Sequence, residues 1–115
     1  MEASRQKERD QLEAAEDRLR TKMEGWAGHP MKNHVRVLLC TLPDVLWEGH
    51  GLERVGMDKL LEVSAVRTAY RKYIAKFHPD KVTQTKDAEK IYIANFVFAA
   101  INEQWGEFKK EHKIK

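Results

Sequence analysis

Residues 66 to 81 read VRTAYRKYIAKFHPDK, a helical pattern that runs into a histidine, a proline and an aspartate. At 100° per residue, one face of this stretch gathers apolar side chains: Val66, Tyr70, Tyr73 and Phe77, flanked by Ala69 and Ile74. Pro79 ends the helix and keeps His78 out of helical backbone angles. The pattern predicts a helix from Ser64, a suitable N-cap, to about Phe77, followed by a stiffened turn.

Basic side chains cover the remaining surface of this helix. Arg67 and Arg71 form one stripe four residues apart, and Lys72 and Lys76 form another on the opposite side. The whole chain has a net charge of only +3, from 21 basic and 18 acidic residues. Residues 64 to 81, however, include five basic residues and only one acidic residue, Asp80, so the excess positive charge is concentrated here. A solvated face is the simplest explanation of such a helix, and a binding surface is the alternative.

A second amphipathic helix is predicted from about Lys86 to Lys113. Its apolar residues recur every three or four positions: Ile91, Ala94, Phe98, Ile101, Trp105 and Phe108. Two such helices joined by a short connection should pack antiparallel. This places His78, Pro79 and Asp80 at the tip of a helical hairpin, where side chains are displayed to a partner.

The sequence pattern in the first third of the chain predicts two more helices. Residues 1 to 24 are rich in charge and carry a thin apolar stripe: Leu12, Ala15, Leu19, Met23 and Trp26. This helix should end or bend at the sequence breakers Gly25, Gly28, His29 and Pro30. The next helix should begin near Asn33, a plausible N-cap, and run through Val35, Leu38, Leu39 and Leu42. Pro43 marks its end or restarts a short turn, and residues 48–58 form a glycine-rich connector.

Composition narrows the class of protein. A chain of 115 residues that is 42% hydrophobic and 34% charged fits one all-α domain. The single Cys40 excludes a disulfide framework and a cysteine-built zinc site, and suits a reducing cytosolic compartment. No apolar run is long enough for a membrane span, and no secretory leader is recognisable, so an intracellular location is expected.

Catalytic and metal sites receive little support from the sequence. His78 and Asp80 could act as an acid and base, but no nucleophile or phosphate-binding glycine loop accompanies them. The histidines lack paired ligand spacing on any predicted element: His29, His34, His50, His78 and His112. We therefore expect no enzymatic activity, no cofactor and no metal.

The stretch quoted above resembles the second helix and the following turn of the J domain, the DnaJ-type co-chaperone module. Between Arg67 and Lys81, nine of fifteen positions agree with the usual pattern: Ala69, Tyr70, Arg71, Lys72, Lys76, His78, Pro79, Asp80 and Lys81. The tripeptide alone is common. At the end of a basic helix, and before an apolar helix that carries INEQW at 101–105, it is highly specific.

Three further segments resemble the auxilin J domain, including that of cyclin G-associated kinase. They are NHVRVLLCTLPDVLW (33–47), VGM (55–57) and FAAINEQWGEF (98–108), and the likeness covers about residues 24 to 110. The usual opening of a J domain, Asp-Tyr-Tyr, is absent. Pro43 departs from the family, which has a continuous helix there, and Thr68 stands where a basic residue is common.

The resemblance implies an all-α fold with an antiparallel helical hairpin, an extended N-terminal helix and a long loop before the second core helix. Residues 1–32 would be the charged helix and turn, and residues 33–115 the auxilin-like J domain. The implied function is to bind a DnaK-type chaperone, the seventy-kilodalton heat-shock ATPase, and to stimulate its ATP hydrolysis for clathrin-coat disassembly. The implied chaperone-binding residues are His78, Pro79, Asp80, Lys81, Arg67, Arg71, Lys72 and Lys76.

The resemblance also implies where the protein acts. We expect a cytoplasmic monomer at clathrin-coated vesicles, which reaches the coat through regions outside or N-terminal to the J domain, with no nucleic acid and no membrane insertion. Asp80 would pair with a chaperone arginine, although a cap on the following turn would also explain it. Three alternatives stay open: a J-domain co-chaperone unrelated to clathrin, a nucleic-acid-binding basic helix, or a coiled coil built on the heptad spacing of Leu12, Leu19 and Trp26.

Overall fold

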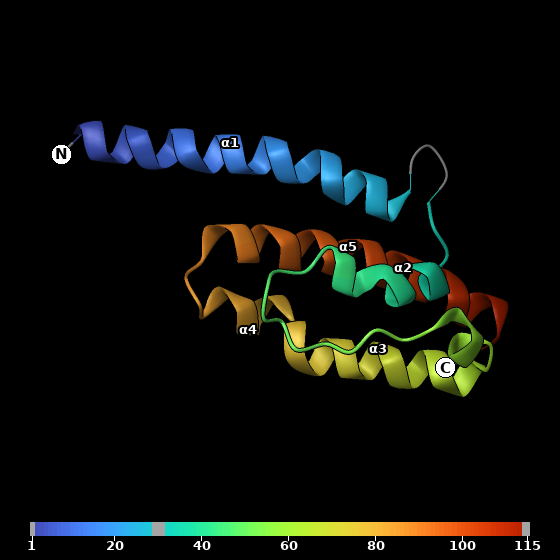
Figure 1. Ribbon diagram of the computed structural model, residues 1–115. Helices are drawn as coiled ribbons and strands as arrows, with labels where there is room; N and C mark the ends of the chain where they lie inside the picture. Colours follow the sequence, from blue (N-terminus) through green and yellow to red (C-terminus); the bar gives the residue numbers. More distant parts are fainter. Residues whose placement is uncertain (1, 29–31, 114–115) are drawn as a thin grey trace.

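The computed structural model describes residues 2–28 and 32–113, with the backbone alone for residues 2–12 and 15. Helices and their connections make up this part of the chain, which contains no strand, and the predicted all-α class is confirmed. The elements, in order, are α1 (Glu2–Ala27), α2 (Val35–Thr41), the 3-10 helices η1 (Leu42–Asp44) and η2 (Met57–Leu60), α3 (Val63–Phe77), α4 (Pro79–Thr83) and α5 (Ala88–Glu111) (Figure 1).

Helices α3 and α5 form the predicted antiparallel hairpin (Figure 1). Large aromatic side chains carry the contact between them: the rings of Tyr70 and Trp105 stack with centroids 4.6 Å apart. The Tyr70 hydroxyl also donates a hydrogen bond to Asn102 Oδ1 at 2.6 Å. The sequence predicted a loop at the tip of the hairpin, and this prediction is wrong in one respect. The chain there forms the short helix α4, which buries Val82.

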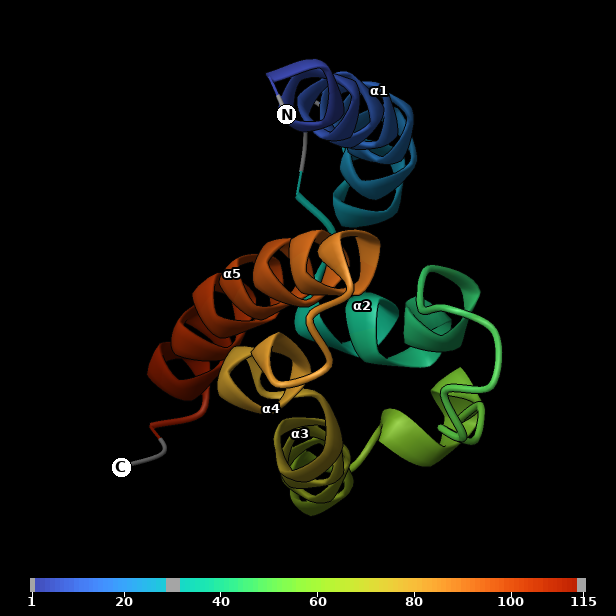
Figure 2. The same cartoon turned by 90° about the vertical axis from the view of Figure 1, so that its left-hand side faces the viewer.

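Helix α5 is buried over a wider surface than one apolar stripe predicts. Ala94, Ile101 and Phe108 are buried as expected, but Ile93 and Val97 are buried as well. Ile91, Phe98 and Trp105, which the periodicity placed in the core, are only half-buried. The reason is that α5 lies at the centre of the fold and contacts α1, α2 and α4 (Figure 2).

The ends of α5 also differ from the prediction. The helix begins at Ala88 rather than near Lys86, because Asp87 is its N-cap and accepts a hydrogen bond from the N–H of Lys90 at 3.1 Å. Lys86 has a positive φ of 58°, which a helical residue cannot have. The helix ends at Glu111, two residues before the expected position.

Helix α1 runs parallel to α5 (Figure 1). Two ion pairs hold this register, Arg18 to Glu89 at 2.5 Å and Lys32 to Glu103, and both join residues that are 71 positions apart. The apolar stripe of α1 enters the common core through Leu19, Met23 and Trp26. Arg18 pairs with Glu89 at the start of α5. Residues 2–16 of α1 therefore project beyond the end of the fold at which α4 lies (Figure 1).

Helix α1 ends at the sequence breakers that follow its apolar stripe. The helix ends at Ala27, and Gly28 follows with a φ of 91°, as the breakers predicted. His29 and Pro30, and the side chains of Leu12 and Ala15, lie outside the described residues. Two of the three heptad positions proposed for a coiled coil, Leu19 and Trp26, are already buried within one copy of the chain.

His34, not Asn33, is the N-cap of α2. Its Nδ1 accepts a hydrogen bond from the N–H of Arg36 at 3.1 Å, whereas the Asn33 side-chain amide donates to the carbonyl of Trp26 at 2.8 Å. An imidazole nitrogen therefore replaces the usual side-chain oxygen of an N-cap. Pro43 lies in the first turn of η1, so the helix ends and a short 3-10 turn follows, as predicted.

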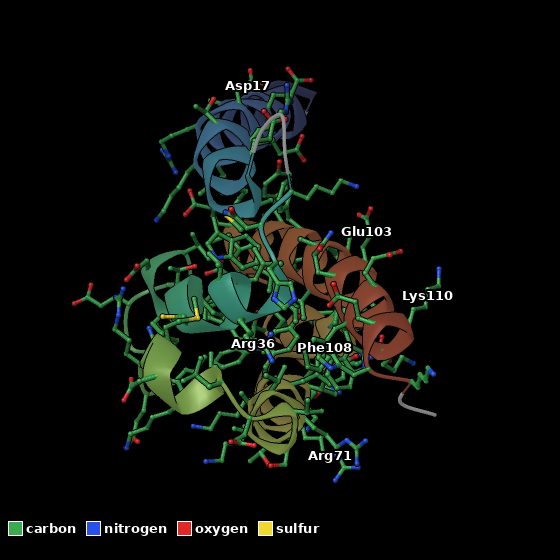
Figure 3. The ribbon with its side chains drawn as sticks, turned by 90° about the vertical axis from the view of Figure 1, so that its right-hand side faces the viewer. Asp17, Arg36, Arg71, Glu103, Phe108 and Lys110 are labelled. Carbon is green, nitrogen blue, oxygen red and sulfur yellow. The ribbon has the colours of Figure 1, made fainter. Side chains whose placement is uncertain are left out.

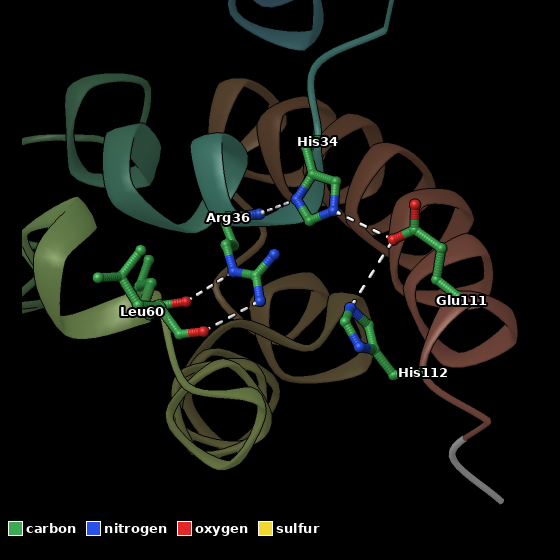
Figure 4. Close-up of polar contacts among 6 residues, drawn as sticks. His34, Arg36, Leu60, Glu111 and His112 are labelled. Carbon is green, nitrogen blue, oxygen red and sulfur yellow. Dashed lines mark hydrogen bonds and ion pairs between the residues drawn. The ribbon is translucent and has the colours of Figure 1, made fainter.

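A polar cluster ties the start of α2 to the end of α5 and to η2 (Figure 4). The Arg36 guanidinium donates to the carbonyls of Leu60 and Leu61 at 2.7 and 3.2 Å, and lies 5.1 Å from the centre of the Phe108 ring. His34 Nε2 lies 3.6 Å from Glu111 Oε2. The cluster therefore connects the start of α2 to the residues that precede α3.

The start of α3 corrects another prediction. The N-cap is Glu62, which makes no side-chain capping hydrogen bond, and Ser64 is already inside the helix. The Ser64 carbonyl accepts a hydrogen bond from the Thr68 hydroxyl at 3.0 Å. The buried face of α3 otherwise agrees with the periodicity, since Val66, Tyr73 and Phe77 are buried and Tyr70 is half-buried.

Candidate functional site

His78 joins α3 to α4 and belongs to both helices. Its backbone N–H donates to the carbonyl of Ile74 at 3.2 Å and so ends α3. Its ring Nδ1 accepts the N–H of Asp80 at 3.1 Å and so caps the start of α4. Because Nδ1 accepts this hydrogen, the neutral ring carries its proton on Nε2. The backbone of His78 is extended, with φ −53° and ψ 136°, as the following proline requires.

The His78 ring is half-buried rather than fully displayed at the tip of the hairpin. It lies edge-on to Phe98 of α5, with centroids 5.1 Å apart. The apolar spacing of α5 assigned Phe98 to the core only, so its contact with the turn was missed. Phe98 lies near the middle of α5, so its position along the helix gave no signal of a contact with the turn.

Asp80 projects from the turn into solvent. Its side chain is 92% exposed, and its carboxylate lies 3.8 Å from His78 Nδ1. The side chain caps no helix, because the cap of α4 is His78. The alternative that Asp80 serves mainly as a cap is therefore wrong. Pro79 is half-buried at the first position of α4, where the absence of an N–H does no harm.

Lys81 does not point freely toward a partner. Its ammonium group donates a hydrogen bond to the carbonyl of Ala75, in the last turn of α3. The last carbonyls of a helix have no partner inside the helix, and a lysine near this end also interacts favourably with the helix dipole. Lys81 therefore stabilises the bend between α3 and α4.

The basic residues of α3 divide into two groups. Arg71 and Lys72 are exposed, and Figure 3 shows Arg71 projecting from α3 away from the body of the protein. Arg67 is half-buried. Lys76 instead donates a hydrogen bond to the carbonyl of Gly51 at 3.2 Å and so holds the connector against α3.

The connector is also packed against the end of α3 that carries the turn. The rings of Trp47 and His50 lie edge-on to Phe77, with centroids 5.6 and 6.4 Å apart. Gly51 follows with a positive φ of 75°, a conformation that favours glycine. Sequence reasoning placed a loop here but gave no sign that it would return along α3. Seven of the eight predicted residues lie on α3 and α4, and His78 joins the two helices. Two of the cations, Lys76 and Lys81, also hold internal contacts.

The described residues contain neither a metal-binding cluster nor a membrane-spanning helix. No group of three or more histidine, cysteine, aspartate or glutamate side chains among them is arranged to hold a metal ion. No helix within residues 2–28 and 32–113 is long and apolar enough to cross a membrane.

The sequence is similar to those of several known proteins. No protein-family model matches the chain. Auxilin-related protein 1 of Arabidopsis thaliana is 36% identical over 85 residues, which cover 73% of this chain and 9% of that protein. The J domain-containing protein required for chloroplast accumulation response 1, also of Arabidopsis thaliana, is 35% identical over 88 residues, 76% of this chain and 13% of that protein.

A third relative comes from yeast. The auxilin-like clathrin uncoating factor SWA2 of Saccharomyces cerevisiae is 31% identical over 84 residues, 70% of this chain and 12% of that protein. The chain thus spans about a tenth of the length of these relatives. The likeness agrees with the helical hairpin, the His-Pro-Asp turn and the basic helix that precedes it. The chain therefore contains a J domain close to those of the auxilin-related proteins.

Proposed function

We propose that this J domain binds a DnaK-type chaperone and stimulates its ATP hydrolysis through the His-Pro-Asp turn and the adjacent face of α3. The exposure of Asp80 is the observation that carries the proposal. His78, Pro79 and Lys81 are all engaged by the fold, whereas the Asp80 carboxylate is 92% exposed. The turn thus fixes the backbone of one residue whose carboxylate stays open to solvent, where it can pair with an arginine of the partner.

The α3 face supplies orientation rather than most of the affinity. Arg67, Arg71 and Lys72 are the cations that the fold leaves for a partner, and exposed ion pairs contribute about 0.2 to 1 kcal/mol each. Together they would supply no more than about 3 kcal/mol, whereas micromolar binding needs about 8 kcal/mol. The face therefore steers the approach of the chaperone, and contacts at the turn select it.

A single-turnover ATPase assay with a DnaK-type chaperone tests this proposal. Asp80→Asn should abolish the stimulation and leave the melting temperature unchanged, because the carboxylate makes no hydrogen bond to any of the described residues. Asp58→Asn is a matched control, since Asp58 is also exposed but lies on η2, at the opposite end of α3. Full stimulation by Asp80→Asn, or equal losses in both variants, would refute the assignment of the site.

We also propose that the chaperone activity serves clathrin-coat disassembly, in the cytoplasm at clathrin-coated vesicles. The support is the likeness to auxilin-related proteins, one of which is described as a clathrin uncoating factor. Neither Asn-Pro-Phe nor Asp-Pro-Phe, short motifs typical of coat and adaptor binding, occurs in the sequence. Recruitment to the coat would then depend on segments of a longer protein, which raise the effective concentration toward millimolar.

Cage disassembly, followed by light scattering with chaperone and ATP, tests this second proposal. We expect the chain alone to disassemble cages poorly and a fusion to an independent clathrin-binding segment to disassemble them well. A fusion that stimulates the ATPase but leaves the cages intact would separate the J domain from clathrin. Equal activity of the unfused chain would place clathrin binding within these 115 residues.

A further inference from the structure

A groove of about 950 Å³ lies between the connector and α3, beside the candidate chaperone site. It exists because the α3 residues that face the connector are small, among them Ala65, Thr68 and Ala69. The Thr68 hydroxyl is directed back to the carbonyl of Ser64, at 3.0 Å, and so leaves the space open. The stretch 51–56 forms the opposite wall, and Lys76 holds it in place.

The groove combines an apolar floor with a basic rim. Buried side chains form the floor: Leu39, Leu42, Leu60 and Tyr73. The charged lining residues are four cations, Arg54, Lys59, Lys72 and Lys76, and two carboxylates, Glu53 and Glu62. Arg54 is paired with Asp44 at 2.6 Å outside the lining. The lysines alone outnumber the two carboxylates, so the rim attracts an acidic ligand.

The connector offers backbone groups to such a ligand. In the part of the chain that the structure describes, the N–H groups of Glu53, Arg54 and Val55 donate to no acceptor. Gly56, which follows them, has extended angles of φ −71° and ψ 150°. A stretch of backbone with unused donors is what an extended peptide requires in order to add a strand alongside.

We propose that this groove binds an extended peptide segment of another protein, with acidic side chains at the lysine-lined rim and apolar side chains on the floor. An extended peptide directs alternate side chains to opposite sides, so a sequence that alternates acidic and apolar residues matches both surfaces. The groove shares Lys72 and Lys76 with the residues assigned to the chaperone, whereas Thr68 and the connector lie outside that assignment. Substitutions at Thr68 therefore test the groove apart from the proposed ATPase stimulation.

Nuclear magnetic resonance titration of the ¹⁵N-labelled chain tests the proposal. The probe is a synthetic heptapeptide that alternates aspartate and valine, and the control peptide has lysine in place of each aspartate. We expect the aspartate peptide to shift the amide signals of residues 51–56 and of Ala65 and Thr68, and the lysine peptide to shift none of them. Absence of these shifts at millimolar peptide, or equal shifts with both peptides, would overturn the proposal.

A substitution at Thr68 separates a groove from a merely basic surface. Thr68→Arg fills the space while it adds positive charge, and arginine is a good helix former, so the fold should persist. Binding in the groove predicts at least about tenfold weaker affinity for Thr68→Arg, with Thr68→Ala close to wild type. Attraction by charge alone predicts tighter binding by Thr68→Arg, and that result would refute the groove. Lys72→Glu should weaken binding by about two- to fivefold.

Discussion

Tyr73→Phe should stabilise the protein, although it deletes a polar group from the core. Tyr73 is 1% exposed, and in the described part of the chain its hydroxyl has no hydrogen-bond partner. A buried hydroxyl without a partner has lost its water and gained nothing in exchange. Phenylalanine keeps the ring, which stacks on Phe77 with centroids 6.4 Å apart, and removes only the unsatisfied oxygen.

The size of the effect follows from this geometry. An unsatisfied buried group costs about 1 to 3 kcal/mol, and the small void left by the oxygen offsets part of the gain. We expect the free energy of unfolding to rise by about 1 kcal/mol, which for a domain of this size raises the melting temperature by about 4 °C.

Tyr70→Phe is the matched control, because the same substitution removes a hydroxyl that does have a partner. The Tyr70 hydroxyl donates to Asn102 Oδ1 at 2.6 Å, so its loss should lower the free energy of unfolding by about 1 kcal/mol. The two variants should therefore change stability in opposite directions. Urea unfolding followed by circular dichroism measures both, and a destabilised Tyr73→Phe would refute the claim that its hydroxyl is unsatisfied.

The same residues determine how stability depends on pH. Burial raises the pKa of Tyr70, and burial together with the nearby Tyr70 raises the pKa of Tyr73 well above its ordinary value of 10.0. Below pH 10 both states of the chain keep the phenol protons. At higher pH the unfolded chain releases them first, so the free energy of unfolding falls, by up to about 1.4 kcal/mol per pH unit for each tyrosine. Tyr73→Phe should remove the Tyr73 contribution, so the free energy of unfolding should fall less steeply with pH above 10. An unchanged slope in this range would contradict the raised pKa of Tyr73.

The remaining predictions concern the turn and the basic face. Lys81→Met should lower the free energy of unfolding by about 1 kcal/mol, because the Ala75 carbonyl loses its donor, and an unchanged thermal melt would contradict the contact. His78→Asn keeps a side-chain N-cap but loses the Phe98 contact, so we expect a destabilisation of about 1 kcal/mol with no ATPase stimulation; full stimulation would show that the imidazole is dispensable. Arg71→Glu should slow association with the chaperone and flatten its salt dependence in stopped-flow measurements, and an unchanged rate at low salt would argue against steering.

Local patterns in the sequence were sufficient to predict the hairpin and the composition of the turn. The spacing of Val66, Tyr73 and Phe77 predicts a helix with one apolar face, because the helical repeat alone decides which side chains share a side. Pro79 predicts the end of α3, because its ring restricts the backbone of its neighbour as well as its own. These constraints act over a few residues, and the structure agrees with them.

Only the tertiary structure decided which charged residues of the site remain available to a partner. By sequence, Arg71, Lys72, Lys76 and Lys81 are equivalent cations near one turn. In the fold, Lys76 binds the carbonyl of Gly51, 25 positions away, and Lys81 binds that of Ala75, whereas Arg71 and Lys72 make no such contact within the described residues. The partner of a flexible lysine is whichever carbonyl the packed chain brings within reach, and packing between distant segments leaves no periodic trace in the sequence.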